Sequence, residues 1–146
     1  MRGGENVRLE EIGWNGYIEE SWRMLGSPEK WIPARVSLTE RACFVVWSEL
    51  GEMEVSARGK LLRKAVPVTG DWVAIDPDLH VIEKVLKRRT HISRKRPGSE
   101  TVEQVLCANL DALCIVCGLD CDLNVRRLER YLALAHSGGV EPLIVL

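Results

Sequence analysis

The side chains best suited to chemistry in this sequence are cations. Residues 84–96 contain seven lysines or arginines and no acidic residue, although the whole chain has a formal net charge of only −1. Cations gathered on one face attract the phosphates of nucleic acids, whereas a run of cations can also be a merely solvated surface. We predict one nucleic-acid-facing surface made of Arg58, Lys60, Arg63, Lys64, Arg88, Arg89, Arg94, Lys95 and Arg96.

Two tryptophans could add base stacking to this surface. Trp47 and Trp72 both lie in runs of β-type residues, and aromatic side chains on such strands stack on the bases of single-stranded nucleic acids. Each could equally belong to a hydrophobic core. Trp72 is the weaker candidate because it lies inside an apolar strand.

The cysteines and histidines do not predict a metal site or a catalytic centre. Cys114, Cys117 and Cys121 have a spacing at which thiolates bind zinc or form a redox pair. However, a three-residue step along a strand turns two side chains to opposite faces, and no histidine or second cysteine pair completes a tetrahedral site. The five cysteines, without a secretory signal, are expected to be reduced thiols.

Nucleotide-binding motifs are missing from the 146 residues. A phosphate-binding loop needs Gly-x-x-x-x-Gly-Lys-Ser/Thr, because its backbone N–H groups and lysine hold the phosphates and its hydroxyl ligates magnesium. Gly59-Lys60 does not fit, since Glu54 stands at the first glycine position and Leu61 at the hydroxyl position. Asn109-Leu-Asp likewise lacks the lysine of a guanine-specificity motif.

The elements that must position the cations begin with a helix and continue as strands. Apolar residues recur at three- and four-residue spacings over residues 9–25, which predicts an amphipathic helix. Short β-type runs separated by turn residues predict strands over residues 32–38, 43–47, 53–57, 71–75 and 81–86. Five strands in so short a stretch are typical of an OB-fold barrel, with another small barrel or an SH3-like sheet as the alternative.

A second unit is expected after the barrel. Residues 110–119 and 142–146 are apolar runs typical of strands in a parallel sheet, and residues 123–135 have the spacing of an amphipathic helix. Ser137-Gly-Gly can end that helix because glycine accepts left-handed backbone. Strand, helix and strand make the βαβ building block of an α/β domain. We expect this domain to be incomplete and the natural polypeptide to continue beyond Leu146. The unpaired strand edges are expected to make the chain prone to association.

The predicted organisation therefore has four parts: a helical segment over residues 1–30, an OB-fold barrel over residues 31–87, a basic linker over residues 88–103, and the truncated beginning of an α/β domain over residues 104–146. The longest apolar run, Ala112–Cys117, is too short to cross a bilayer. No signal peptide is visible at Met1. We expect a cytoplasmic protein without a membrane partner.

Six motifs, in this order and spacing, resemble the RsgA family of ribosome-small-subunit-dependent GTPases, also called EngC or YjeQ. The likeness runs from about Leu9 to Leu146. The motifs are Ile12-Gly-Trp, Ala57-Arg-Gly-Lys-Leu, Pro67-Val-Thr-Gly-Asp-Trp-Val, Val85-Leu-Lys-Arg-Arg-Thr, Glu103-Gln-Val-Leu-Cys-Ala-Asn-Leu-Asp and Asn124-Val-Arg-Arg-Leu-Glu-Arg-Tyr-Leu.

The resemblance implies a fold and a function. The fold is an all-β OB-fold barrel with a short N-terminal helix, followed by an incomplete α/β start of a circularly permuted P-loop GTPase domain. The function is late maturation of the small (30S) ribosomal subunit, with 16S rRNA as partner and GTP hydrolysis stimulated by the ribosome. The full-length protein is expected to be a monomer that uses GTP, magnesium and a C-terminal zinc.

This chain by itself is expected to hold no cofactor and to be inactive as an enzyme. The guanine-specificity, phosphate-loop and Asp-x-x-Gly motifs of the family would lie beyond Leu146, so we predict no GTP-binding, catalytic or metal-binding residue here. The barrel would keep the ribosome-docking role. The alternative is a stand-alone OB-fold RNA-binding module without enzymatic activity.

Overall fold

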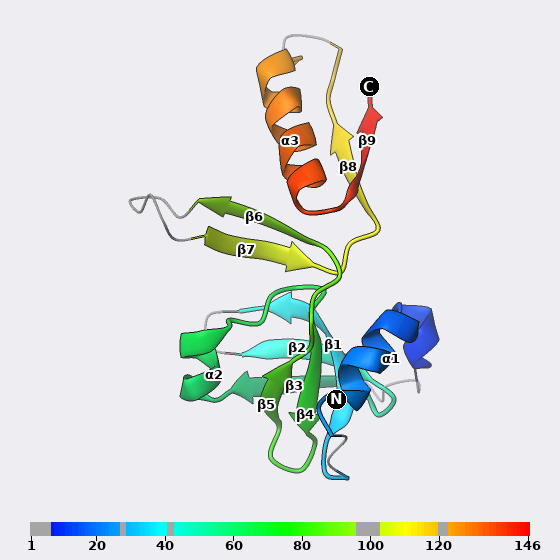
Figure 1. Cartoon of the computed structure of the whole chain (residues 1–146), viewed down its shortest axis with the longest axis vertical. Helices are drawn as coiled ribbons and strands as arrows, with labels where there is room; N and C mark the ends of the chain where they lie inside the picture. The colour runs from blue at the N-terminus through cyan, green and yellow to red at the C-terminus, as the bar shows by residue number, and fades with distance from the viewer. Residues whose placement is uncertain (1–6, 27–28, 41–42, 96–102, 120–122) are drawn as a thin grey trace. The chain divides into compact units, whose positions relative to one another are not determined.

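The computed structural model describes residues 7–26, 29–40, 43–95, 103–119 and 123–146, and of Lys95 the backbone alone. The chain divides into two compact units, Met1–Arg88 and Arg89–Leu146. Figure 1 shows a barrel with an attached helix in the first unit, and a hairpin and a strand–helix–strand element in the second.

The N-terminal segment forms a 3₁₀ helix, Leu9–Ile12, and helix α1, Gly16–Arg23. The sequence predicts a single helix over residues 9–25, but Gly13 has a φ of 96° and separates the two pieces. Asn15 then caps α1, because its side-chain oxygen accepts hydrogen bonds from the backbone N–H groups of Tyr17 and Ile18.

Five strands close the barrel in the order β1-β2-β3-β5-β4. Their bounds are β1 Ile32–Thr39, β2 Phe44–Ser48, β3 Gly51–Ala57, β4 Trp72–Asp76 and β5 Val81–Val85. All neighbours are antiparallel except β3 and β5, which are parallel, and β4 returns to pair with β1. The predicted OB-fold barrel is confirmed, and this strand order rules out the SH3-like alternative.

The barrel has a core on each side of strand β4. Its interior is filled by alternate apolar residues of the strands, which are Ala34, Val36, Phe44, Val46, Val55, Val73, Ile75 and Ile82. The outward residues Trp72 and Ala74 pack instead against Ile18 of α1. This arrangement explains why every residue of β4 is buried and why its sequence is nearly continuously apolar although β4 pairs with antiparallel neighbours.

A short helix that the sequence does not predict, α2 (Gly59–Lys64), connects β3 to β4. Six residues are too few to display helical periodicity, and Arg58 at its start gives no side-chain cap. Leu61 packs against the barrel core. The other side chains of the segment are therefore turned outward.

The second unit begins with a two-stranded antiparallel sheet, β6 (His91–Lys95) and β7 (Glu103–Ala108). Residues 88–103, expected to be a linker without regular structure, thus contain strand β6 and lead into β7. The charged residues of this segment interrupt the apolar pattern by which a strand is predicted from sequence. Ile92 and Ala108 are buried, which shows that the hairpin has an apolar anchor.

The remainder of the second unit is the expected strand–helix–strand element. Strand β8 (Ala112–Val116) and strand β9 (Glu141–Val145) are parallel and joined through helix α3 (Val125–Ser137). Helix α3 packs against β6, β8 and β9, with Ala135 buried. No helix in the described part of the chain is long and apolar enough to cross a membrane.

Candidate nucleic-acid interface

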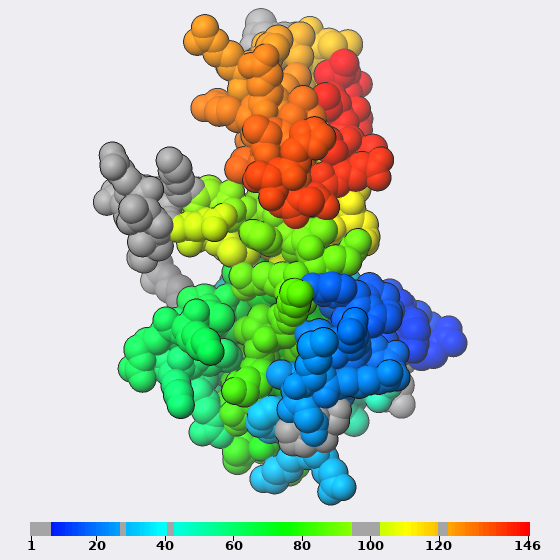
Figure 2. Space-filling model, viewed as in Figure 1, coloured from blue at the N-terminus to red at the C-terminus, as the bar shows by residue number. Residues whose placement is uncertain are grey.

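Helix α2 carries the exposed cations of the barrel unit. Because Leu61 faces the core, Lys60, Arg63 and Lys64 project into solvent. Among the described residues none of these three has an acidic partner within ion-pair distance. In the space-filling view α2 is the green segment at the edge of the barrel (Figure 2). Three unneutralised cations within one helical turn and a half can attract a polyanion.

Arg58, just before α2, is neutralised in part by Glu83 of strand β5. Its Nη2 and Nε lie 2.6 and 2.8 Å from Glu83 Oε1. This hydrogen bond, together with the carboxylate charge, raises the pKa of the Arg58 guanidinium above its ordinary value. Arg58 is exposed, but its charge contributes less to the surface than the charges of α2.

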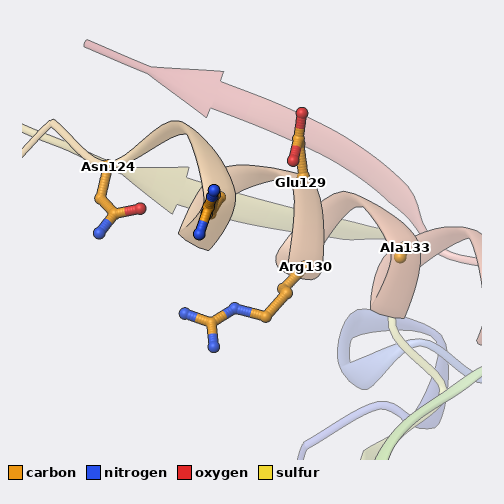
Figure 3. Close-up of a pocket in the computed structure, with 5 residues that line it drawn as sticks. Asn124, Glu129, Arg130 and Ala133 are labelled. Atoms are coloured by element: carbon orange, nitrogen blue, oxygen red, sulfur yellow. The ribbon is translucent and has the colours of Figure 1, made fainter.

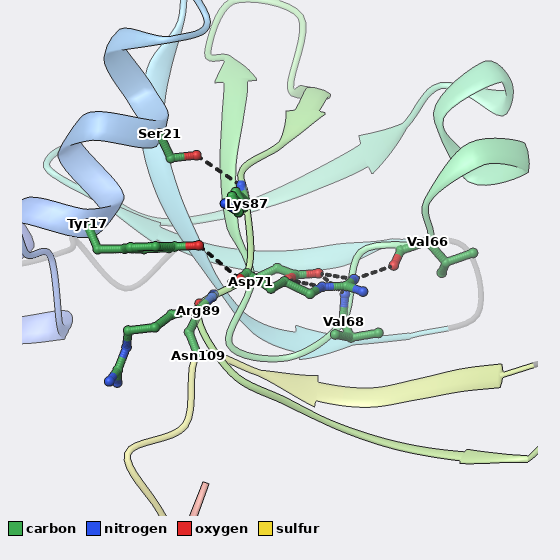
Figure 4. A network of polar contacts seen from close by, with 9 residues as sticks. Tyr17, Ser21, Val66, Val68, Asp71, Lys87, Arg89 and Asn109 are labelled. Carbon is green, nitrogen blue, oxygen red and sulfur yellow. Dashed lines mark hydrogen bonds and ion pairs between the residues drawn. The ribbon is translucent and has the colours of Figure 1, made fainter. Parts of the chain in front are cut away.

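Arg88 makes an ion pair with the buried Asp71, whose contacts are drawn as dashed lines in Figure 4. Its Nε and Nη2 each lie 2.8 Å from a different oxygen of the Asp71 carboxylate, which is fully buried. The backbone N–H of Val68 also donates to this carboxylate, and Arg88 Nη2 donates to the carbonyl of Val66. The hydrogen bond to Asp71 raises the pKa of Arg88.

Helix α1 holds the same chain segment from the other side. The Tyr17 hydroxyl donates to the carbonyl of Arg88 at 3.2 Å, and the backbone N–H of Lys87 donates to the Ser21 hydroxyl at 3.0 Å (Figure 4). The side chain of Arg88 thus connects the segment that follows β5 to Asp71, which directly precedes β4. Because its guanidinium already donates to Asp71 and Val66, Arg88 has few donors left for a phosphate. The sequence alone did not predict this structural ion pair.

The remaining predicted cations belong to the second unit. Arg89 forms an ion pair with Asp111, and its backbone N–H donates to the Asn109 side chain. Arg94 is exposed on β6. Lys95 lies in β6 with no described side chain, and Arg96 lies outside the described residues. The nine predicted residues are therefore divided between two units, and a single surface containing all of them stays a prediction.

The two candidate stacking tryptophans have different environments. Trp72 is 1% exposed and packs edge-on against Trp14 with ring centroids 5.0 Å apart, so the core interpretation holds for it. Trp47 is 41% exposed on β2. However, its Nε1 donates to Glu52 at 2.8 Å, and Glu54 is also exposed on the same strand as Glu52. These carboxylates would repel phosphates near Trp47.

The structure brings together no metal-binding cluster of His, Cys, Asp or Glu in the residues that it describes. Cys114 is exposed whereas Cys117 is buried, and Cys121 lies outside the described residues. Burial raises the pKa of the Cys107 thiol above its ordinary value, which disfavours the reactive thiolate. The 146 residues also contain no Gly-x-x-x-x-Gly-Lys-Ser/Thr phosphate loop, the motif that holds nucleotide phosphates and magnesium.

The described residues thus form an OB-fold barrel with an exposed basic helix, and a parallel βαβ element typical of an α/β domain. A family model described as "RsgA GTPase" matches residues 85–146. The chain is 36% identical to the small ribosomal subunit biogenesis GTPase RsgA of Opitutus terrae over 96% of its own length and 42% of that protein. It is 37% identical to the RsgA of Syntrophotalea carbinolica over the same shares.

The same similarity appears with RsgA 2 of Vibrio parahaemolyticus, 36% identical over 94% of this chain and 37% of that protein. The chain belongs to the RsgA family. It spans about two fifths of the length of these curated relatives.

Solved structures agree with the fold. YjeQ from Thermotoga maritima superposes with a TM-score of 0.57 at 23% identity, over 78% of this chain and 40% of that one. YloQ, described as a circularly permuted GTPase, gives a TM-score of 0.51 at 19% identity, over 78% of this chain and 39% of that one. At these identities the likeness concerns the fold alone.

Proposed function

We propose that this chain is the part of a ribosome biogenesis GTPase that docks on the small ribosomal subunit, with 16S rRNA as its partner and helix α2 as its contact. The observation that carries the proposal is the 36% identity, over 96% of the chain, to a small ribosomal subunit biogenesis GTPase. The exposed cations of α2 supply the matching chemistry.

The physical basis of docking is the neutralisation of phosphates. Lys60, Arg63 and Lys64 are exposed and have no acidic partner within the part of the chain that the structure describes, so binding RNA costs them no existing ion pair. Each cation that neutralises a phosphate releases a counterion, and affinity then falls as salt rises. Arg58 and Arg88 contribute less because Glu83 and Asp71 already neutralise them.

The activity of the whole protein is also part of the proposal. We infer that it hydrolyses GTP when stimulated by the ribosome, acts in the cytoplasm during late maturation of the 30S subunit, and is monomeric at full length. GTP and magnesium would be held by motifs that these 146 residues do not contain. We therefore expect the chain alone to release no phosphate from GTP, a result that a phosphate-release assay with and without 30S subunits would check.

Co-sedimentation with purified 30S subunits tests the docking role. The variant Arg63→Ala/Lys64→Ala removes two charges of α2, and alanine keeps the helix propensity. The control Arg8→Ala/Arg23→Ala removes two charges that already pair with Glu11 and Glu19. We expect salt-sensitive binding of the wild-type chain, about tenfold weaker in the α2 variant and nearly unchanged in the control. Equal binding of all three chains would refute the α2 contact.

A further inference from the structure

Helix α3 of the second unit carries a hollow that the predicted interface does not include. It measures about 560 Å³ and is lined by Asn124, Arg126, Glu129, Arg130 and Ala133 (Figure 3). Sequence periodicity places Arg126, Glu129 and Arg130 away from the apolar face of the helix, but it does not predict a concave surface there. The hollow is open and shallow rather than enclosed.

The charge in the hollow comes from Arg126 and Arg130. The two residues are four apart, so they lie one turn apart on the same helix face, about 6 Å along the axis. Both are exposed. Neither guanidinium has an ion pair or hydrogen bond among the described residues, in contrast to Arg58, Arg88 and Arg89, which all face carboxylates.

Glu129 is the one acidic residue of α3, and it lowers the positive charge of the hollow without forming a contact with either arginine. Figure 3 shows its carboxylate projecting to a different side of the helix from Arg130, which extends back toward Asn124. No ion pair joins Glu129 to Arg126 or Arg130 in the residues that the structure describes. The hollow is therefore a site of net positive charge with two forked donors free to bind.

The backbone that carries the two arginines is well fixed. Asn124 Oδ1 accepts a hydrogen bond from the backbone N–H of Arg127 at 3.1 Å, and this leaves the amide NH₂ of Asn124 as a donor at the rim. Ala135 is fully buried on the opposite side of the helix. The two arginines are thus carried by a capped helix whose opposite side is packed.

We propose that this hollow binds the phosphodiester backbone of RNA, with Arg126 and Arg130 as its phosphate contacts. The planar fork of arginine matches the geometry of a phosphate and can bind it through two hydrogen bonds. Of the described residues that line the hollow, only Ala133 is apolar, whereas the centre of a protein–protein interface is depleted in charge and rich in aromatic residues. RNA therefore fits the hollow better than a protein partner does.

This proposal rests on the proposed function, in which the chain docks on ribosomal RNA, and it adds a second contact on a different unit from α2. It assigns no base specificity, because contacts to phosphates position a protein on RNA without reading sequence. Its consequence is that both units of the chain bind RNA through lysines and arginines that have no acidic partner among the residues that the structure describes.

The test measures binding of the 146-residue chain to protein-free 16S rRNA and, in parallel, to intact 30S subunits. Arg126→Ala/Arg130→Ala is compared with the charge-matched control Arg8→Ala/Arg23→Ala, and circular dichroism verifies that α3 remains folded. For Arg126→Ala/Arg130→Ala we expect about tenfold weaker binding to both targets at 0.1 M salt. The slope of log Kd against log salt should be smaller by about 2. Glu129→Gln should bind two- to threefold more tightly.

The outcomes separate this proposal from the proposed function. If Arg63→Ala/Lys64→Ala weakens binding but Arg126→Ala/Arg130→Ala does not, the α3 site is refuted and docking through α2 stands. If only Arg126→Ala/Arg130→Ala weakens binding, the α3 site is supported and the α2 contact is refuted. Loss confined to intact subunits would identify a protein partner and overturn the RNA assignment. A wild-type chain that binds neither target refutes both.

Discussion

Among the described residues, arginines divide by what they face. Arg88 meets a carboxylate with no access to solvent, Arg89 meets the carboxylate of Asp111, which is 90% exposed, and Arg63, Arg126 and Arg130 face solvent. A buried ion pair that loses one partner leaves an uncompensated charge, whereas an exposed pair is screened by water. The same residue type therefore serves stability in one place and is available for binding in another.

Replacement of Arg88 by alanine should expose this difference. Among the described residues, the buried Asp71 carboxylate would keep only the hydrogen bond from Val68, so we expect a loss of about 3 kcal/mol in the free energy of unfolding. Arg89→Ala is the matched control and should cost less than about 1 kcal/mol. Urea unfolding followed by circular dichroism compares the two, and equal losses would contradict the structural role of Arg88.

The elements of the fold depend on close backbone approaches as well as on apolar faces. Gly138 ends α3 with a φ of −87°, which any residue can adopt, and the left-handed position expected in the Ser137-Gly-Gly segment belongs to Gly139, with a φ of 70°. A Cβ on Gly138 would lie 1.8 Å from the carbonyl oxygen of His91. Only glycine lets α3 approach strand β6 this closely.

Gly138→Ala should therefore destabilise the second unit by about 2 kcal/mol or more, because the alanine methyl meets rigid backbone. Gly59→Ala is the control: a Cβ there meets nothing within 4 Å, and alanine should be neutral or slightly stabilising in α2. Hydrogen exchange resolved by residue measures both. Unchanged hydrogen-exchange protection of β6 and α3 in Gly138→Ala would show that the close approach of Gly138 to His91 does not contribute to stability.

The sequence predicted the barrel strands well because their apolar residues alternate or form short runs between Gly, Pro and Asp turns. It failed where this signal is weak: α2 is only six residues long, and β6 is masked by Arg94 and Lys95. The ion pair of Arg88 was also out of reach, since Asp71 lies 17 residues away and only the fold brings the two together. Charge patterning identified candidate cations but not which of them were already neutralised.

At the scale of the whole molecule, the second unit exposes much apolar surface. Val116 of β8, Leu143, Ile144 and Val145 of β9, and the adjoining Leu146 are all exposed. Two parallel strands and one helix cannot cover both faces of a sheet. Such a patch and the unpaired strand edges favour association between chains.

We expect the 146-residue chain to associate with increasing concentration, while a version ending at Arg88 stays monomeric. The shorter version keeps the complete barrel, α1 and the Asp71–Arg88 pair, and it should unfold cooperatively. Size-exclusion chromatography with light scattering measures both proteins. A long chain that is monomeric at every concentration would contradict the prediction, and a short version that fails to fold would show that the barrel depends on the second unit.

The central claim, that α2 of this RsgA-family chain touches 16S rRNA, is tested most directly by site-specific photocrosslinking on 30S subunits. A photoreactive residue replaces Leu62, which is 40% exposed on α2, or, as a control, Met24, which is 76% exposed next to α1. The account predicts ultraviolet-dependent crosslinks from position 62 to 16S rRNA and few or none from position 24. Crosslinks from position 62 to ribosomal proteins alone, or equal crosslinking from both positions, would contradict it.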